Sequence, residues 1–332
     1  MIVATGVGSM PGDDAVAYRE AVDLVAGELP DLPHLVEMPG RGPHADLTGR
    51  ALAVVAELGA DLQPAGWRLT GGPGSSGVDH RRARSLLAQD LDAVEERMQG
   101  YSGPFKIQVA GPWTLAATVE KPRGDRALSD QGARRELAQA LAEGLRAHVA
   151  DVRRRLPGAD LVVQVDEPAL PAVLAGSIPT ASGFHRHRSV DAPGATPALE
   201  GVFAAVTEAG ASAVVHCCAA DVPVGLLVGA GASGVSVDLD VLPAAAYDAL
   251  ADLLEKGRPV HLGVLPSTRP ESTLTDRAVT ERVLRWLEML GLDPETADSL
   301  VITPSCGLGS ADAGWARRAM ELSQTVAVGL RG

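Results

Sequence analysis

The sequence predicts an α/β protein that forms a single (β/α)8 barrel, a TIM barrel, with long loops at the C-terminal face. Three observations predict this fold: eight short apolar runs alternate with segments of helical period, polar or sulfur-bearing residues follow most of these runs, and no linker divides the 332 residues. The length exceeds the roughly 250 residues typical of the fold, and the excess falls in the loops 39–46, 64–78 and 176–195. We therefore expect one domain over residues 1–332.

The predicted strands are short and rich in β-branched residues, as expected for parallel strands that are buried on both faces. In chain order they are residues 2–7, 34–38, 105–109, 161–165, 213–216, 234–237, 260–264 and 300–303. The segments between them repeat apolar residues at every third or fourth position, which is typical of amphipathic helices. The clearest stripe is Leu137, Leu141, Leu145, Val149, Val152 and Leu156, and the other predicted helices are residues 13–27, 79–99, 196–209, 243–256, 275–290 and 311–328.

A doubly wound open sheet is the alternative fold. It would need fewer strands, and usually a glycine-rich turn that binds phosphate between a strand and a helix. Residues 71–77 are rich in glycine, but no strand closely precedes them and no Lys follows. The pattern therefore favours the barrel.

The composition excludes several classes of protein. Acidic residues number 42 and basic residues 29, which gives a net charge of −13, whereas a nucleic-acid-binding protein needs a basic face. No run of about 18 apolar residues could span a membrane. The first six residues lack the basic and apolar regions of a signal peptide, so we expect a cytoplasmic location. Three cysteines, two of them adjacent, do not make a disulfide framework.

Four side chains that could bind a metal lie at predicted strand ends, where the active site of this fold is found. His216 and Cys218 are two residues apart, so in an extended chain they point to the same side while Cys217 points away. Cys306 ends the last strand and Asp238 the sixth. An imidazole, two thiolates and a carboxylate suit zinc, and no compact pair of cysteines indicates a structural zinc finger. The alternative is that the cysteines are ordinary core residues.

Substrate-binding groups are predicted at three other strand ends. Asp166 and Glu167 follow the fourth strand, and could hold a substrate ammonium or act as a base, or else stabilise a helix N-terminus. Ser9, in the glycine-containing segment 6–11, could hydrogen-bond a carboxylate or could belong to a simple turn. Trp113 follows the third strand and could stack on a planar ligand.

Seven stretches, taken together and in order, resemble the C-terminal catalytic barrel of the cobalamin-independent methionine synthases. They are residues 6–11, 66–67, 110–115, 164–170, 216–218, 236–238 and 304–308. Each stretch alone is unspecific, but the joint match runs nearly from end to end. The resemblance implies an enzyme of methionine biosynthesis, a zinc-dependent methyltransferase that passes a methyl group to the sulfur of homocysteine.

The resemblance also implies roles for individual residues. The implied zinc ligands are His216, Cys218, Cys306 and Asp238. Asp238 stands where the family usually has Glu, and its side chain is one methylene shorter. The Val7 backbone, Ser9 and Asp166 match residues that hold the carboxylate and the ammonium of the amino acid. Zinc deprotonates a bound thiol, whereas a free thiol with a pKa of about 8.5 is mostly protonated at neutral pH, so the bound sulfur could attack an activated methyl group in line.

The sequence departs from the family at positions that concern the amino acid and the methyl donor. The family's second acid for the amino acid matches Arg41, although Glu37 is nearby, and the aromatic residue that stacks on the pterin of the folate matches Thr118. The family's proton-shuttling His after the seventh strand has no counterpart. The implied donor is therefore either a methyl-folate or a methylated corrinoid protein.

Two other functions are kept as alternatives. One is a barrel enzyme of the uroporphyrinogen decarboxylase type, which needs no zinc. The other is a non-catalytic relative that binds a thiol metabolite or a corrinoid protein, which the residues at 41 and 118 make plausible.

Overall fold

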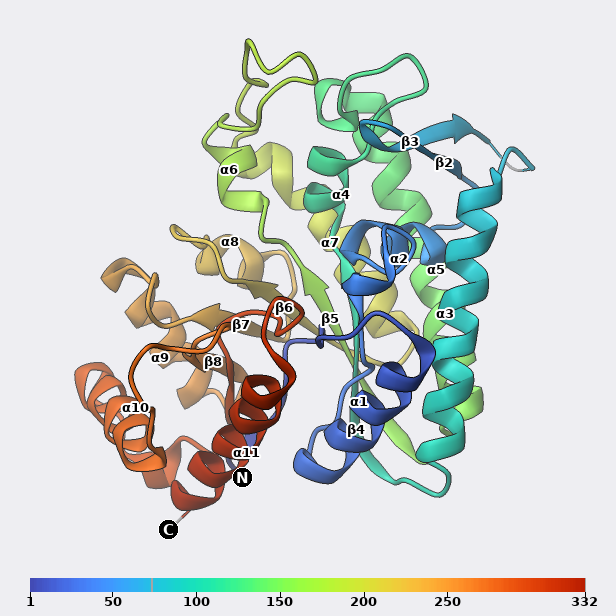
Figure 1. Cartoon of the computed structure of the whole chain (residues 1–332). Helices are drawn as coiled ribbons and strands as arrows, with labels where there is room; N and C mark the ends of the chain where they lie inside the picture. The colour runs from blue at the N-terminus through green and yellow to red at the C-terminus, as the bar shows by residue number, and fades with distance from the viewer. Residues whose placement is uncertain (73, 332) are drawn as a thin grey trace.

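The computed structural model describes residues 1–72 and 74–331, and its main feature is a curled sheet of seven parallel strands with helices around it (Figure 1). Along the sheet the order is β1-β9-β8-β7-β6-β5-β4. Strands that follow one another in the chain are therefore neighbours, and the first strand pairs with the last. The strands are β1 (Val3–Ala4), β4 (Gly103–Ala110), β5 (Ala159–Asp166), β6 (Ser212–Cys217), β7 (Gly234–Asp238), β8 (Val260–Leu265) and β9 (Leu300–Pro304).

Seven of the eight predicted strands are confirmed, but the closed barrel of eight strands is not. The predicted second strand, residues 34–38, is not a strand of the sheet. It makes one parallel bridge to each edge of the sheet, Glu37 with Ser9 and His34 with Lys106. Prolines flank this segment on both sides, and a proline supplies no N–H group to a ladder. The segment therefore links the two edges without extended pairing. The order of the strands shows no reversal, so the doubly wound alternative is also wrong.

The seven predicted helices are present, with ends within a few residues of the predicted ones apart from the start of α5, and four short helices were not predicted. The long helices are α1 (Ala15–Glu28), α3 (Val78–Arg97), α5 (Gln131–Arg155), α7 (Ala192–Glu208), α9 (Tyr247–Glu255), α10 (Asp276–Leu290) and α11 (Ala313–Gly329). The short ones are α2 (Leu47–Val54), α4 (Pro112–Thr118), α6 (Leu170–Leu174) and α8 (Val224–Gly229). Among the described residues, no helix has both the length and the apolar character that crossing a membrane requires.

Aspartates define where five helices begin. Each precedes the first helical residue and accepts a hydrogen bond from a backbone N–H of the first turn, which is otherwise unpaired. These N-cap residues are Asp14, Asp46, Asp130, Asp191 and Asp312. Within α5, the predicted apolar stripe is buried, from Leu137 at 0% to Leu156, just past its end, at 3% exposure. Capping sets the ends of these helices, and burial of the stripe fixes which face packs on the molecule.

A hairpin replaces part of a predicted loop. The strands β2 (Gly59–Gln63) and β3 (Gly66–Gly71) pair antiparallel within the region 64–78 and just before it. The turn uses Gly66, whose φ of +118° is rarely open to other residues. Trp67 and Leu69 are buried on one face of the hairpin, while Arg68 between them is more exposed. Of the glycine-rich segment, Pro73 lies outside the described residues.

The inner face of the sheet is polar where β4 and β5 pass each other. Successive side chains of a strand point to opposite faces. In β4, Phe105 and Ile107 therefore lie on the side opposite to Lys106 and Gln108, and all four are buried. Lys106 reaches across to Gln164 of β5 with a hydrogen bond of 2.6 Å. This buried polar row leads toward the carboxyl ends of the strands.

Candidate active site

Three of the four predicted metal ligands meet at the carboxyl ends of two strands. His216 lies in β6, Cys218 directly after it, and Cys306 two residues after β9. One ligand atom from each lies within 4.8 Å of the other two. The sulfur atoms of Cys218 and Cys306 are 3.0 Å apart. Two strands, β7 and β8, lie between β6 and β9 in the sheet, so the curl of the sheet brings together residues that are 88 positions apart in the chain.

The imidazole of His216 presents one nitrogen that has no partner. Its Nδ1 lies 2.9 Å from the hydroxyl of Ser236, on the neighbouring strand β7. Its Nε2 is buried and makes no hydrogen bond with any residue that the structure describes, which is costly for a polar atom unless a further partner binds there. A metal ion is such a partner, and a hydrogen bond to the other ring nitrogen commonly fixes the orientation of a metal-binding histidine.

The pKa values of the two thiols, Cys218 and Cys306, are shifted in opposite directions. A hydrogen bond from Cys218 and the nearby His216 both lower the pKa of Cys306. The same hydrogen bond and burial raise the pKa of Cys218. One thiolate beside one thiol is thus the favoured state of the pair, and a cation would favour loss of the second proton.

The structure does not bring Asp238 into this group. It ends β7, but its carboxylate accepts a hydrogen bond of 2.9 Å from the backbone N–H of Asp240 and is not among the three ligands that converge. Its short side chain closes a local turn instead. Cys217, the residue expected to point away, is buried at 1% exposure and also lies outside the group.

A cavity of about 220 Å³ joins the metal-ligand group to predicted substrate-binding residues. Val7, Ser9 and Asp166 line it together with His216, Cys218 and Cys306. Glu37 also lines it, so two carboxylates face the same small space. The cavity can therefore hold a small ligand with a thiol at one end and an ammonium at the other.

A tight contact joins the segment of Ser9 to the segment of Cys306. The Ser9 hydroxyl accepts a hydrogen bond of 3.1 Å from the N–H of Gly309, which leaves its own proton free to donate to a ligand. The Ser9 carbonyl accepts one of 2.8 Å from the N–H of Leu308. At Gly307, any side chain would collide with the Ser9 hydroxyl. Glycine at 307 is thus a steric requirement of the site.

Below the cavity, Lys106 and Gln164 hold Val7 and Asp166 in position. The Lys106 ammonium donates to the Val7 carbonyl at 2.9 Å and to the Gln164 side chain. The Gln164 amide donates to the Val7 carbonyl at 2.9 Å and to Asp166 at 2.7 Å. Burial raises the pKa of Asp166 to about 7 and lowers the pKa of Lys106 to about 7. Burial thus disfavours both charges, and the attraction between Asp166 and Lys106 opposes each shift.

Glu37 belongs to a second buried network. Its carboxylate lies 3.4 Å from the Arg50 guanidinium, which also contacts Asp90 at 2.7 Å. Arg41 binds both oxygens of Asp90, at 2.8 and 2.7 Å. Burial raises the pKa of Glu37, and Arg50 and Lys106 oppose that shift. Arg41 thus faces Asp90, and Glu37 supplies the second acid of the cavity.

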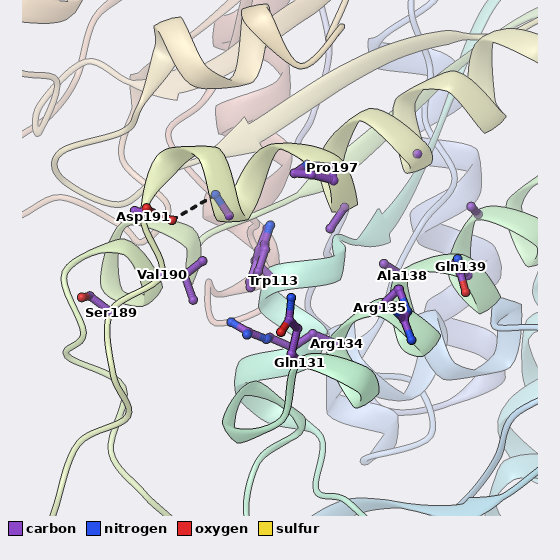
Figure 2. Close-up of a pocket in the computed structure, with 14 residues that line it drawn as sticks. Trp113, Gln131, Arg134, Arg135, Ala138, Gln139, Ser189, Val190, Asp191 and Pro197 are labelled. Carbon is purple, nitrogen blue, oxygen red and sulfur yellow. Dashed lines mark hydrogen bonds between the residues drawn. The ribbon is translucent and has the colours of Figure 1, made fainter.

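Two predicted substrate-binding residues lie elsewhere. Glu167 is fully buried, and its carboxylate accepts hydrogen bonds from the backbone N–H groups of Trp113 and Thr114 and from the Thr114 hydroxyl, at 2.8 to 2.9 Å. It stabilises the N-terminus of α4, the alternative role expected for it. The Trp113 indole donates to the Ala195 carbonyl at 3.1 Å and lines a different pocket, between α5 and α7 (Figure 2). Adjacent residues at the end of β5 point to opposite sides, so only Asp166 reaches the cavity.

Thr118 offers no flat surface for a pterin. Its hydroxyl donates to the Thr114 carbonyl at 2.8 Å and lies 3.5 Å from the hydroxyl of Thr48.

Lys106 and Gln164 were not predicted as residues of the site, but the sequence contains a feature that could have identified them. Each is a polar residue in the middle of an apolar strand that is buried on both faces, where a long polar side chain needs a specific partner.

Comparison with known proteins gives a family and a fold. The family model for the catalytic domain of the cobalamin-independent synthases matches residues 103–328. No curated protein sequence matches the chain. A solved structure of a B12-independent methionine synthase from Shewanella sp. W3-18-1, in complex with selenomethionine, aligns with a TM-score of 0.66 at 14% identity, over 100% of this chain and 98% of that one. At this identity the likeness indicates a shared fold.

Other solved structures are less similar. A β-mannanase from Cryptopygus antarcticus aligns with a TM-score of 0.46 at 10% identity, over 97% of this chain and 90% of that one. A β-mannanase from the blue mussel Mytilus edulis gives 0.43 at 11% identity, over 98% and 92%. Similarity at this level supports no inference about activity.

Proposed function

Because the chain belongs to the family of cobalamin-independent synthase catalytic domains, we propose that it is a zinc-dependent methyltransferase that methylates the sulfur of homocysteine to give methionine. The observation that carries this proposal is the meeting of His216, Cys218 and Cys306 in one small cavity with Asp166 and Glu37. A thiol-binding metal site and an ammonium-binding pair of acids thereby flank a space suited to a small amino acid.

The residues present fit a zinc ion. His216 offers a buried nitrogen that has no partner among the described residues, and an imidazole nitrogen and the two sulfur atoms lie within 4.8 Å of one another. One nitrogen and two sulfur ligands are a set that zinc prefers, and three protein ligands leave a fourth position for a substrate. When bound, zinc would act as a Lewis acid that makes the substrate thiol a thiolate at neutral pH.

The remaining groups of the cavity would orient the amino acid. Asp166 and Glu37 provide the negative charge that an ammonium group needs. The Ser9 hydroxyl, whose oxygen already accepts from Gly309, can donate its proton to the substrate carboxylate. Lys106 balances the charge of Asp166 from below, so that the acid can stay ionised in a buried place. With both ends of the amino acid fixed, its sulfur would face the open side of the cavity, where the methyl donor approaches.

We further propose that the donor is either a methylated corrinoid protein or a methyl-folate. Supporting the first is the small hydroxyl of Thr118, which gives a pterin nothing to stack on. In either case the sulfur lone pair forms the new S–C bond as the methyl carbon leaves the donor, so the three atoms must lie in line.

We also propose that residues 34–38 serve as the second strand of an eight-membered barrel. We further propose that the enzyme works in the cytoplasm, where thiols stay reduced.

The direct test measures methionine formed from homocysteine by the zinc-loaded protein. Methylcobalamin and 5-methyltetrahydrofolate serve as alternative donors, and the protein treated with a chelator is the control. We expect product with at least one donor, and at least a ten-fold loss of rate after zinc removal, since a neutral thiol is a poor nucleophile.

Two outcomes would replace this proposal. If homocysteine raises the melting temperature of the zinc-loaded protein but neither donor gives methionine, the chain is a thiol-binding relative without activity. If the reduced protein takes up no zinc, thiol activation fails altogether. Decarboxylation of uroporphyrinogen without zinc would then be the activity to measure.

A further inference from the structure

A second pocket, larger than the metal-ligand cavity, lies between the first halves of α5 and α7. Its volume is about 820 Å³, against about 220 Å³ for the cavity, and the two share no lining residue. Figure 2 shows its walls: α5 with Arg134 and Arg135, α7 with Pro197, and Trp113 from α4 between them. The volume is in the range of sites for small organic ligands.

Small residues keep this pocket open. Ala138 and Ala142 of α5 and Gly194, Ala198 and Gly201 of α7 line it. A Cβ atom added at Gly201 would meet no other atom within 4 Å. Short side chains of two helices thus bound the pocket, and the space next to Gly201 is empty.

The polar side chains around the pocket are mostly hydrogen-bond donors without partners. Five lining side chains make no hydrogen bond or ion pair within the described part of the chain: Gln131, Arg134, Arg135, Gln139 and Ser189. The Arg134 guanidinium lies 5.7 Å from the centre of the Trp113 ring, and its Nε is buried without a hydrogen bond.

Two carboxylates near the pocket are already engaged. Asp191 lines it, but its oxygen accepts the N–H of Gly194 at 3.0 Å and caps α7 (dashed line in Figure 2). Asp130 caps α5 through the N–H of Ala133 at 2.8 Å, and its charge is felt by Arg134 without an ion pair. The guanidinium groups therefore keep free N–H donors, which suit carboxylate, sulfonate or phosphate oxygens.

We propose that this pocket binds an organic anion with an apolar, planar body. The anionic group lies against Arg134 and Arg135, and the body lies along the small residues of α7 beside Trp113. Neither the metal-ligand residues nor the acids of the cavity take part, so binding here is separate from methyl transfer.

The test compares two fluorescent probes that differ in charge. The anion 8-anilinonaphthalene-1-sulfonate and its uncharged analogue N-phenyl-1-naphthylamine share the same aromatic body. We expect one anion to bind per chain, and the neutral analogue to bind at least about ten-fold more weakly, because it forgoes a charge-assisted hydrogen bond. Energy transfer from Trp113 should fall in Trp113→Phe.

Two matched glycine variants locate the binding. Gly201→Leu fills the pocket, whereas Gly225→Leu places the same side chain on α8, where a Cβ also meets nothing within 4 Å. Leu is a better helix former than Gly, so neither change should unfold the protein. We expect Gly201→Leu to abolish probe binding and Gly225→Leu to leave it unchanged, while Arg134→Met weakens the anion about ten-fold and leaves the neutral probe unaffected.

Several results would overturn the proposal. They are no binding of the anion, equal binding of both probes, or equal binding by the Gly201 and Gly225 variants. A loss of zinc in Gly201→Leu would contradict the separation of this pocket from the metal-ligand cavity.

Discussion

The two halves of the cavity are built in different ways. His216, Cys218 and Cys306 stand at or just after the ends of regular parallel strands, so the curled sheet carries all three toward one place. Ser9 and Glu37 belong to irregular segments joined by a single bridge, and both lie outside the residues that match the family model. Buried side chains hold this second half. A regular backbone therefore positions the metal-ligand half, and a network of buried charges positions the amino-acid half.

The largest expected effect breaks the metal-ligand half. Cys306→Ser removes one of three converging ligands, and we expect zinc affinity to fall about 100-fold or more because a neutral hydroxyl replaces a thiolate. The measurement is zinc content by mass spectrometry after dialysis against a weak chelator. Cys217→Ser is the matched control, since Cys217 is buried outside the group. Equal zinc loss in both variants would contradict the assignment.

Glu37→Gln tests the amino-acid half. An ammonium that loses a carboxylate partner should cost about 1.5–3 kcal/mol, or roughly 10- to 100-fold in affinity for methionine, with zinc content unchanged. Isothermal titration calorimetry measures it. Arg41→Gln is the comparison, because Arg41 faces Asp90. We expect that variant to bind methionine nearly as the wild type does. If Arg41→Gln weakened methionine binding and Glu37→Gln did not, position 41 would be the one that contributes to amino-acid binding.

Lys106→Met tests whether the buried Lys106 ammonium supports binding of the substrate amine through Asp166. The comparison ligand is 4-(methylthio)butanoate, which lacks the amine. We expect the ratio of the affinity for methionine to the affinity for this ligand to fall about ten-fold, because Asp166 would then have no cation beneath it. Binding of the amine-free acid should change little. Gln108→Met is the control on the same strand, since the hydrogen bond of the Gln108 side chain goes to the Leu35 carbonyl and not to Asp166 or Val7. An equal loss for both ligands would indicate general damage to the fold.

Acid should destabilise the apoprotein through buried histidines. Burial lowers the pKa of His148 to about 4, with the Arg50 cation adding to the shift. Between pH about 6.5 and 4 the unfolded chain binds a proton that the folded chain does not, so stability falls as the pH falls, by about 3 kcal/mol from this residue. Urea unfolding at pH 7 and pH 4.5 measures it, and His148→Leu should show the smaller drop. An identical drop in both proteins would assign the effect to other groups.

The smallest expected effect is at Asp238. Its carboxylate holds the N–H of Asp240, so Asp238→Ala should change zinc affinity by no more than about three-fold, less than 1 kcal/mol. Competition with a coloured chelator measures this change. A ten-fold loss would mean that the carboxylate swings in to become the fourth ligand.

The sequence is informative where a residue's role follows from strand geometry. His216 and Cys218 could be paired from their spacing alone, and seven strands were predicted from their composition. The second strand was not confirmed, because prolines at both ends limit its pairing to isolated bridges. Glu167 was predicted to bind substrate together with Asp166. The two are adjacent, however, and adjacent residues at the end of a strand face opposite sides. The network around Lys106 could not be predicted, since its members, Val7, Lys106 and Gln164, come from three separate segments.

The contact between Ser9 and the loop after β9 has a consequence for the order in which the protein folds. It spans 300 residues, and the C-terminal Arg331 likewise holds the carbonyl of Ile2 at 2.6 Å, so that the two ends of the chain lie together in Figure 1. Closing a loop of that length costs about 5 kcal/mol of chain entropy. On the ribosome, Cys306 is added 88 residues after Cys218. The three possible metal ligands can therefore meet only after residue 306 has been made and the strand β9 has joined the sheet.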